Sequence, residues 1–104
     1  MEATLLLLEI RALLEAVYGS RLKGVVLFGS AARGDQRPES DIDVLVLLDR
    51  VVDYGHDLRT NIETLYPLAV RTGRRISAKP VAEQDYQAID CPLYRNARRE
   101  GVAA

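Results

Sequence analysis

The chain has 104 residues, of which 48% are hydrophobic and 28% charged, and its formal net charge at pH 7 is −1. These values predict a single globular domain spanning residues 1–104 and exclude a fibrous or intrinsically disordered chain. The balanced charge provides no general basic field for nucleic acid. A single cysteine excludes an internal disulfide and favours a cytoplasmic location, and no apolar run is long enough to cross a membrane.

The first half of the chain predicts one helix and two strands. Apolar residues at three- and four-residue spacings indicate an amphipathic helix from Thr4 to Tyr18, with Thr4 as its N-cap and Gly19 as its end. The continuous apolar run at residues 25–28 predicts a strand covered on both faces. A polar loop follows, and "DIDVLVLLD" (41–49) predicts a second buried strand.

The second half predicts a helix, a strand and a last helix. Apolar residues at spacings of four, three and four indicate a helix packed on the sheet and disturbed at Pro67: Leu58, Ile62, Leu65 and Ala69. "RRISAKPV" (74–81) predicts a third strand, and its Pro80 favours a sheet edge. Residues 82–102 predict a final helix interrupted at Pro92. Strands separated by helices predict an α/β (α+β) domain, with helices packed on a small mixed sheet.

Two aspartates at the start of the second strand are the first chemical signal. Because side chains alternate along a strand, Asp41 and Asp43 share one face, with their Cα atoms roughly 6–7 Å apart. Two carboxylates this close repel each other unless a cation lies between them. Oxygen ligands of this kind suit Mg²⁺, which is commonly bound by one or two carboxylates together with substrate phosphates.

The preceding loop supplies groups that suit a phosphate. Gly29 has no Cβ and therefore allows a close approach to the backbone. Ser30 can donate its hydroxyl and its N–H at the start of a short helical turn, where anions are favoured. Arg33 adds a planar cationic group that matches phosphate oxygens. Together with the aspartates, the loop predicts a site for a nucleoside triphosphate and its metal.

The stretch "LFGSAARGDQRPESDIDVLV" (27–46) resembles the signature of the minimal nucleotidyltransferases, small members of the DNA-polymerase-β-like superfamily. That signature is Gly-Ser, ten residues and Asp-x-Asp, which here are Gly29-Ser30, residues 31–40 and Asp41-Ile42-Asp43. The resemblance implies a polymerase-β-like palm in which Asp41 and Asp43 hold one or two Mg²⁺ ions and Ser30 contacts the triphosphate of ATP. It also implies transfer of a nucleoside monophosphate to an acceptor hydroxyl, with release of pyrophosphate.

A third carboxylate, which the superfamily usually carries on a later strand, is not evident. The inward residues of "RRISAKPV" are either Ser77 and Lys79 or, with the opposite parity, Ile76 and Ala78. Glu83 and Asp85 follow that strand as candidate substitutes, at the expected start of the last helix. Lys79 is a candidate phosphate contact, although a lysine on an edge strand also guards against aggregation.

The expected acceptor is another protein. The chain ends at Ala104 without a second domain, and no stripe of aromatic and basic residues favours a nucleic-acid substrate. Chains of this kind resemble the antitoxins of two-gene modules with HEPN-domain toxins, which implies AMP transfer to a tyrosine of the toxin. Two alternatives remain. One is a catalytically weakened antitoxin that binds nucleotide and metal and acts by complex formation. The other is a small-molecule nucleotidyltransferase that works with a separate helical subunit.

Overall fold

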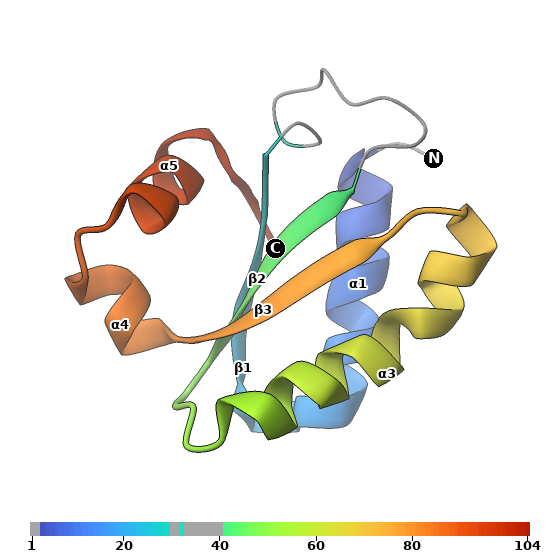
Figure 1. Cartoon of the computed structure of the whole chain (residues 1–104), viewed down its shortest axis with the longest axis horizontal. Coiled ribbons are helices and arrows are strands. Elements are labelled where there is room, and N and C mark those ends of the chain that lie inside the picture. The colour runs from blue at the N-terminus through green and yellow to red at the C-terminus, as the bar shows by residue number, and fades with distance from the viewer. Residues whose placement is uncertain (1–2, 30–31, 33–40) are drawn as a thin grey trace.

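A computed structural model of the chain describes residues 3–29, 32 and 41–104. Its elements, in chain order, are α1 (Ala3–Tyr18), the short 3₁₀ helix η1 (Gly19–Arg21), β1 (Leu22–Phe28), β2 (Ile42–Leu48), α3 (Tyr54–Thr72), β3 (Ile76–Ala82), α4 (Glu83–Ala88), α5 (Pro92–Glu100) and β4 (Val102–Ala103). Figure 1 shows the sheet with α1 and α3 on one side and α4 and α5 on the other. No helix among the described residues is long and apolar enough to span a membrane.

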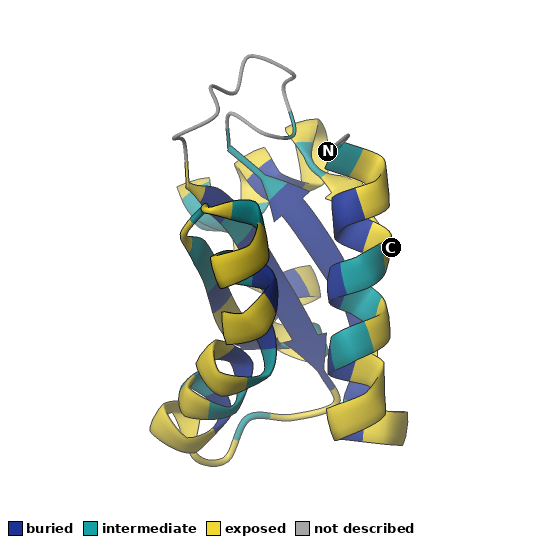
Figure 2. Cartoon of the chain, turned by 90° about the vertical axis from the view of Figure 1, so that its right-hand side faces the viewer, coloured by how far each residue is buried: buried dark blue, intermediate teal, exposed yellow. Residues whose placement is uncertain are grey.

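The sheet has four strands in the order β3-β2-β1-β4. β2 is antiparallel to β1 and parallel to β3, and β4 pairs antiparallel with β1. The predicted small mixed sheet, with the third strand at an edge, is therefore confirmed. β2 lies in the interior of the sheet, and every residue of this strand except Asp43 is buried. Figure 2 shows buried strands, in dark blue, between the helices.

The two faces of the sheet carry separate apolar clusters, because side chains alternate along each strand. On one face, Ile42, Val44, Val46 and Leu48 of β2 pack in the cluster that includes residues of α1 and α3. On the other face, Leu45 and Leu47 pack with residues of α4 and α5. Asp43 belongs to this second face by the same alternation.

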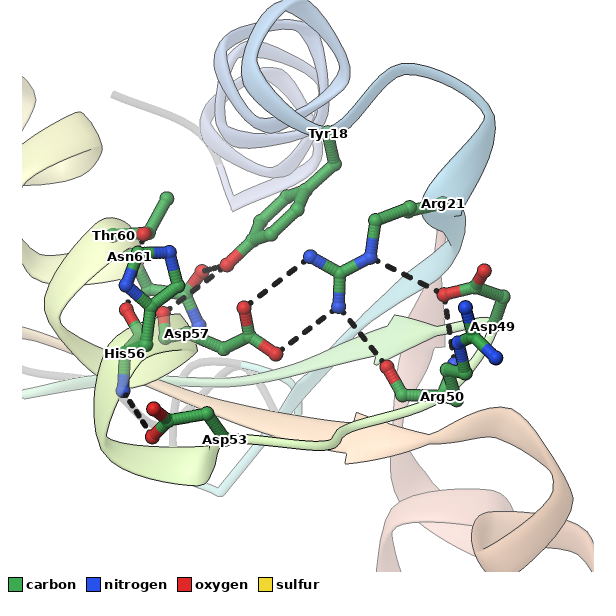
Figure 3. A network of polar contacts seen from close by, with 9 residues as sticks. All are labelled: Tyr18, Arg21, Asp49, Arg50, Asp53, His56, Asp57, Thr60 and Asn61. Carbon is green, nitrogen blue, oxygen red and sulfur yellow. Dashed lines mark hydrogen bonds and ion pairs between the residues drawn. The ribbon is translucent and has the colours of Figure 1, made fainter.

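The buried side of α3 differs from the predicted one. Ile62 is 54% exposed, whereas Asp57 and Asn61 are 3% and 0% exposed. Polar contacts with Tyr18 and Arg21 explain why this side of α3, and not the predicted side, faces the core (Figure 3). The Tyr18 hydroxyl donates to Asn61 Oδ1 at 2.5 Å, and the Arg21 guanidinium donates to both carboxylate oxygens of Asp57 at 3.1 and 3.3 Å. These pairs satisfy the polar groups and let them replace apolar residues in the core.

Further differences concern element ends. α1 spans Ala3–Tyr18, so Thr4 lies within the helix and not at the predicted N-cap position before it. α3 continues through Pro67, with Leu65 and Leu68 buried on either side of it. The predicted last helix is two helices, because Pro92 occupies the first turn of α5, where a missing N–H costs little. The short strand β4 was not predicted.

The paired carboxylate of Asp57 provides a test of the α3 packing. We expect Asp57→Asn to lower the free energy of unfolding by about 1–3 kcal/mol, because it removes the buried charge that faces Arg21. Asp49→Asn is the matched control, since Asp49 also pairs with Arg21, at 3.3 Å, but is exposed. It should cost less than about 1 kcal/mol in urea-induced unfolding. Equal losses in the two variants would contradict the assignment.

Tyr18 provides a second test, in alkaline solution. Burial, and to a smaller extent the charge of Asp57, raise the pKa of Tyr18 from 10.0 to about 12. The folded state therefore favours the protonated phenol. Its contribution to stability is fully present below pH 10 and is lost as the pH rises to about 12.

We therefore expect Tyr18→Phe to lose less stability than the wild-type chain over this alkaline range. Urea unfolding at a series of pH values measures the difference. Tyr66→Phe, which removes a phenol that is 64% exposed, is the control for the loss of a tyrosine. A Tyr18→Phe profile that falls as steeply as that of the wild type would contradict the role of Tyr18.

Candidate active site

The predicted site residues fall into two groups. Gly29, Asp41 and Asp43 belong to the described part of the chain, whereas Ser30 and Arg33 lie outside the described residues. The described three come from two neighbouring strands. Gly29 directly follows β1, and Asp41 and Asp43 lie at the start of β2. Because β1 and β2 are antiparallel, the end of the first strand lies beside the start of the second.

The backbone of Gly29 lies directly against the carboxylate of Asp43. In the β1–β2 register, Phe28 pairs with Asp43, which brings the next residue, Gly29, to this carboxylate. Gly29 has a φ of +77°, in the left-handed region, and a Cβ added there would stand 2.8 Å from Asp43 Oδ2. A side chain at this position would therefore meet both backbone strain and a clash. The structure thus explains why glycine suits this position.

Asp41 and Asp43 interact electrostatically, as the sequence predicted. Burial raises the pKa of Asp43, the negative charge of Asp41 raises it further, and the positive charge of Lys79 opposes both effects. Asp41 itself is exposed, and its Oδ2 lies 3.9 Å from Arg75 Nη1. This proximity of Arg75 could not be predicted from the sequence, because it depends on where β3 begins beside β2.

β3 contributes polar side chains to the same face of the sheet. The parallel register pairs Asp43 with Ser77 and Leu45 with Lys79, so Ser77 and Lys79 share the face of Asp43. Ala78 is buried in the opposite cluster, with Ile76 packed against it. Of the two alternatives for β3, the side chains on the face of Asp43 are therefore those of Ser77 and Lys79. The structure also places a hydroxyl, and not a carboxylate, opposite Asp43.

Glu83 and Asp85 do not complete the carboxylate pair. They begin α4, immediately after β3 ends at Ala82. Ala82 pairs with Leu48, at the end of β2 opposite to Asp43. At about 3.3 Å per residue along a strand, the separation from the start of β2 is roughly 20 Å. No group of three or more His, Cys, Asp or Glu side chains that could hold a metal occurs within residues 3–29, 32 and 41–104.

The carboxylates of Asp41 and Asp43 suit a hard divalent cation that also binds the phosphates of a nucleotide. Asp41 and Asp43 offer only carboxylate oxygens. A cation bound between them would relieve the repulsion between their charges. The absence of a side chain on Gly29 makes room for the Asp43 carboxylate, which lies directly against the Gly29 backbone. Two carboxylates fill only part of the coordination sphere of Mg²⁺, so phosphate oxygens and water would supply the remaining ligands.

Comparison with known proteins supports a nucleotide site. Residues 9–89 match the nucleotidyltransferase domain family. The "Putative protein adenylyltransferase MJ0604" of Methanocaldococcus jannaschii is 38% identical over 89 residues, which cover 85% of this chain and 83% of that protein.

Solved structures share the fold. A crystal structure of a toxin–antitoxin with AMP-PNP superposes with a TM-score of 0.65 at 21% identity, covering 91% of this chain and 69% of that chain. A "putative minimal nucleotidyltransferase" superposes with a TM-score of 0.56 at 26% identity, covering 98% and 95% of the two chains. The predicted polymerase-β-like fold and the prediction of an enzyme of this class are therefore confirmed, and the chain belongs to the nucleotidyltransferase domain family.

Proposed function

We propose that this chain transfers AMP from ATP to a tyrosine hydroxyl of a HEPN-domain toxin, and that it acts as the antitoxin of that partner in the cytoplasm. The observation that carries the proposal is the carboxylate pair of Asp41 and Asp43 at the start of β2, with Asp43 packed against the side-chain-free backbone of Gly29. A metal–triphosphate complex is commonly held by one or two such carboxylates together with the oxygens of the phosphates.

Two relatives support the choice of reaction and partner. The similar protein of Methanocaldococcus jannaschii carries the name of a protein adenylyltransferase, and its match extends over most of both chains. The toxin–antitoxin crystal structure that shares the fold contains AMP-PNP, an analogue of ATP. The HEPN identity of the partner and the tyrosine acceptor come from the sequence resemblance.

The mechanism assigns a separate task to each part of the site. Asp41 and Asp43 would hold Mg²⁺, which neutralises negative charge on the phosphates when bound. Gly29 allows the triphosphate to approach the backbone, and Ser30 and Arg33 remain the predicted contacts of the phosphate oxygens. The acceptor oxygen attacks the α-phosphorus as the bond to the β-phosphate breaks. The hydroxyl proton is released and pyrophosphate leaves, so the protein mainly positions the reactants.

A second candidate is an antitoxin that acts by complex formation with little or no transfer. The observation that favours it is Ser77, which stands opposite Asp43 on β3, where a third carboxylate would be in position to bind metal. A site with two carboxylates can bind a metal–nucleotide complex and yet transfer slowly. The two candidates differ in whether the carboxylates are needed for neutralisation of the partner.

A transfer assay separates the two candidates. The chain is mixed with the purified product of the neighbouring gene, ATP and Mg²⁺, and the intact mass of the partner is measured. We expect the mass of one AMP to be added per modified tyrosine. Asp43→Asn should abolish the gain, because a neutral amide cannot replace the metal-binding carboxylate. Asp49→Asn, which changes an exposed aspartate just after the far end of β2, should leave it unchanged.

The outcome also decides how the antitoxin acts. The partner could form a complex yet remain unmodified, and Asp43→Asn could still protect cells fully. These two results together would show that the antitoxin acts by complex formation and not by AMP transfer. An unmodified partner that forms no complex would reject both candidates.

Gly29→Ala tests the close approach at the site. We expect ATP binding in the presence of Mg²⁺ to weaken by more than about tenfold, measured by calorimetry, because the new methyl group displaces the Asp43 carboxylate. Gly73→Ala is a matched control: Gly73 has a similar φ of +69°, but no atom lies within 4 Å of an added Cβ. Both variants should lose about 1 kcal/mol of stability from backbone strain. Equal ATP affinity in the two variants would contradict the role of Gly29.

A further inference from the structure

Lys79 occupies the boundary between the carboxylate pair and the apolar half of the same sheet face. On this face, Leu45 and Val81 are buried beneath α4 and α5. Lys79, which pairs with Leu45 and lies between Ser77 and Val81 in the alternation of β3, is exposed. Its ammonium group is therefore available at the edge of the site.

The register brings the Lys79 side chain within reach of the site. Neighbouring strands lie about 4.8 Å apart and each residue advances about 3.3 Å, so the Cα atoms of Lys79 and Asp43 are about 8 Å apart on the diagonal. A long side chain spans such a diagonal. The positive charge of Lys79 accordingly lowers the pKa of Asp43, while Asp41 raises it.

The role of Lys79 as a guard of the sheet edge is a weaker explanation. β3 is an edge strand, and an exposed lysine discourages pairing with another chain. However, Pro80 follows Lys79 directly, and a proline without an N–H already interrupts an edge against strand addition. A guarding lysine also has no need to lie on the face of Asp43, where its charge alters the carboxylate.

A triphosphate at this face of the sheet needs positive charge beside the carboxylates. The two carboxylates alone repel phosphate, and a metal shared with the nucleotide offsets this repulsion. An ammonium group two residues along β3 from Ser77 adds a positive charge that remains when the metal leaves. A lysine acts on phosphate as a compact charge with three donors.

We propose that Lys79 binds the triphosphate of the nucleotide, beside the carboxylates that hold its metal. This inference rests on the proposed function for the identity of the ligand, but it concerns binding and not transfer. It adds a specificity determinant to the site: Lys79 selects nucleotides by their phosphates and makes no distinction between acceptors.

Equilibrium binding of ATP with Mg²⁺ tests this role. We expect Lys79→Gln to weaken ATP binding by about tenfold, as for the loss of one charge-assisted hydrogen bond. Lys79→Arg, which keeps the charge, should retain most of the affinity. Adenosine, which has no phosphates, should bind the wild-type chain and Lys79→Gln equally. Lys23→Gln is the matched control, because Lys23 is an exposed strand lysine at the far end of β1.

Several results would overturn the inference. These are an unchanged affinity of Lys79→Gln for ATP, an equal loss for ATP and adenosine, or a wild-type chain that binds no ATP. Self-association of Lys79→Gln with unchanged ATP affinity would assign Lys79 to edge protection. A chain that binds ATP in a Lys79-dependent way but leaves the partner unmodified would reject the proposed transfer and leave this inference in place.

Discussion

The parallel hydrogen bonding between β2 and β3 is the constraint on which the candidate site depends. It pairs Asp43 with Ser77 and Leu45 with Lys79, and so decides which side chains join the carboxylates. A shift of one residue would send the buried Ala78 to the site and Ser77 to the core. Asn61 of α3 donates its side-chain N–H to the Ala78 carbonyl at 3.0 Å, so the helix that covers the sheet also contacts the backbone of this strand.

The sequence predicts the site best where the signal is local. Gly29, Asp41 and Asp43 belong to one short stretch, and the antiparallel pairing of β1 with β2 brings Gly29 to Asp43. The role of β3 was open, because its two faces carry Ser77 and Lys79 or Ile76 and Ala78, and only pairing with β2 decides between them. Ser30 and Arg33 lie outside the described residues, and their roles stay predictions.

The fold was predictable in its class and less so in its packing. Apolar runs and helical spacings identified three strands and the two long helices. The buried face of α3 could not be read from apolar spacing, because Asp57 and Asn61 enter the core through partners in α1 and η1 that are distant in sequence. β4 escaped prediction for a similar reason. Two residues form a strand only because β1 offers a free edge, where Ala104 exchanges two backbone hydrogen bonds with Val25.

The contacts of Arg21, which stabilise the fold, lie at the opposite end of the sheet from the candidate site. This guanidinium joins η1 to Asp49, the Arg50 carbonyl and Asp57, all at the end of β2 away from Asp43 (Figure 3). The fold is therefore secured at one end of the sheet, while the electrostatic repulsion of the carboxylates is confined to the other. Charged groups around Asp43 can change without removing the contacts that Arg21 makes with Asp49, the Arg50 carbonyl and Asp57. Substitutions at the candidate site should therefore cost the fold less stability than substitutions around Arg21.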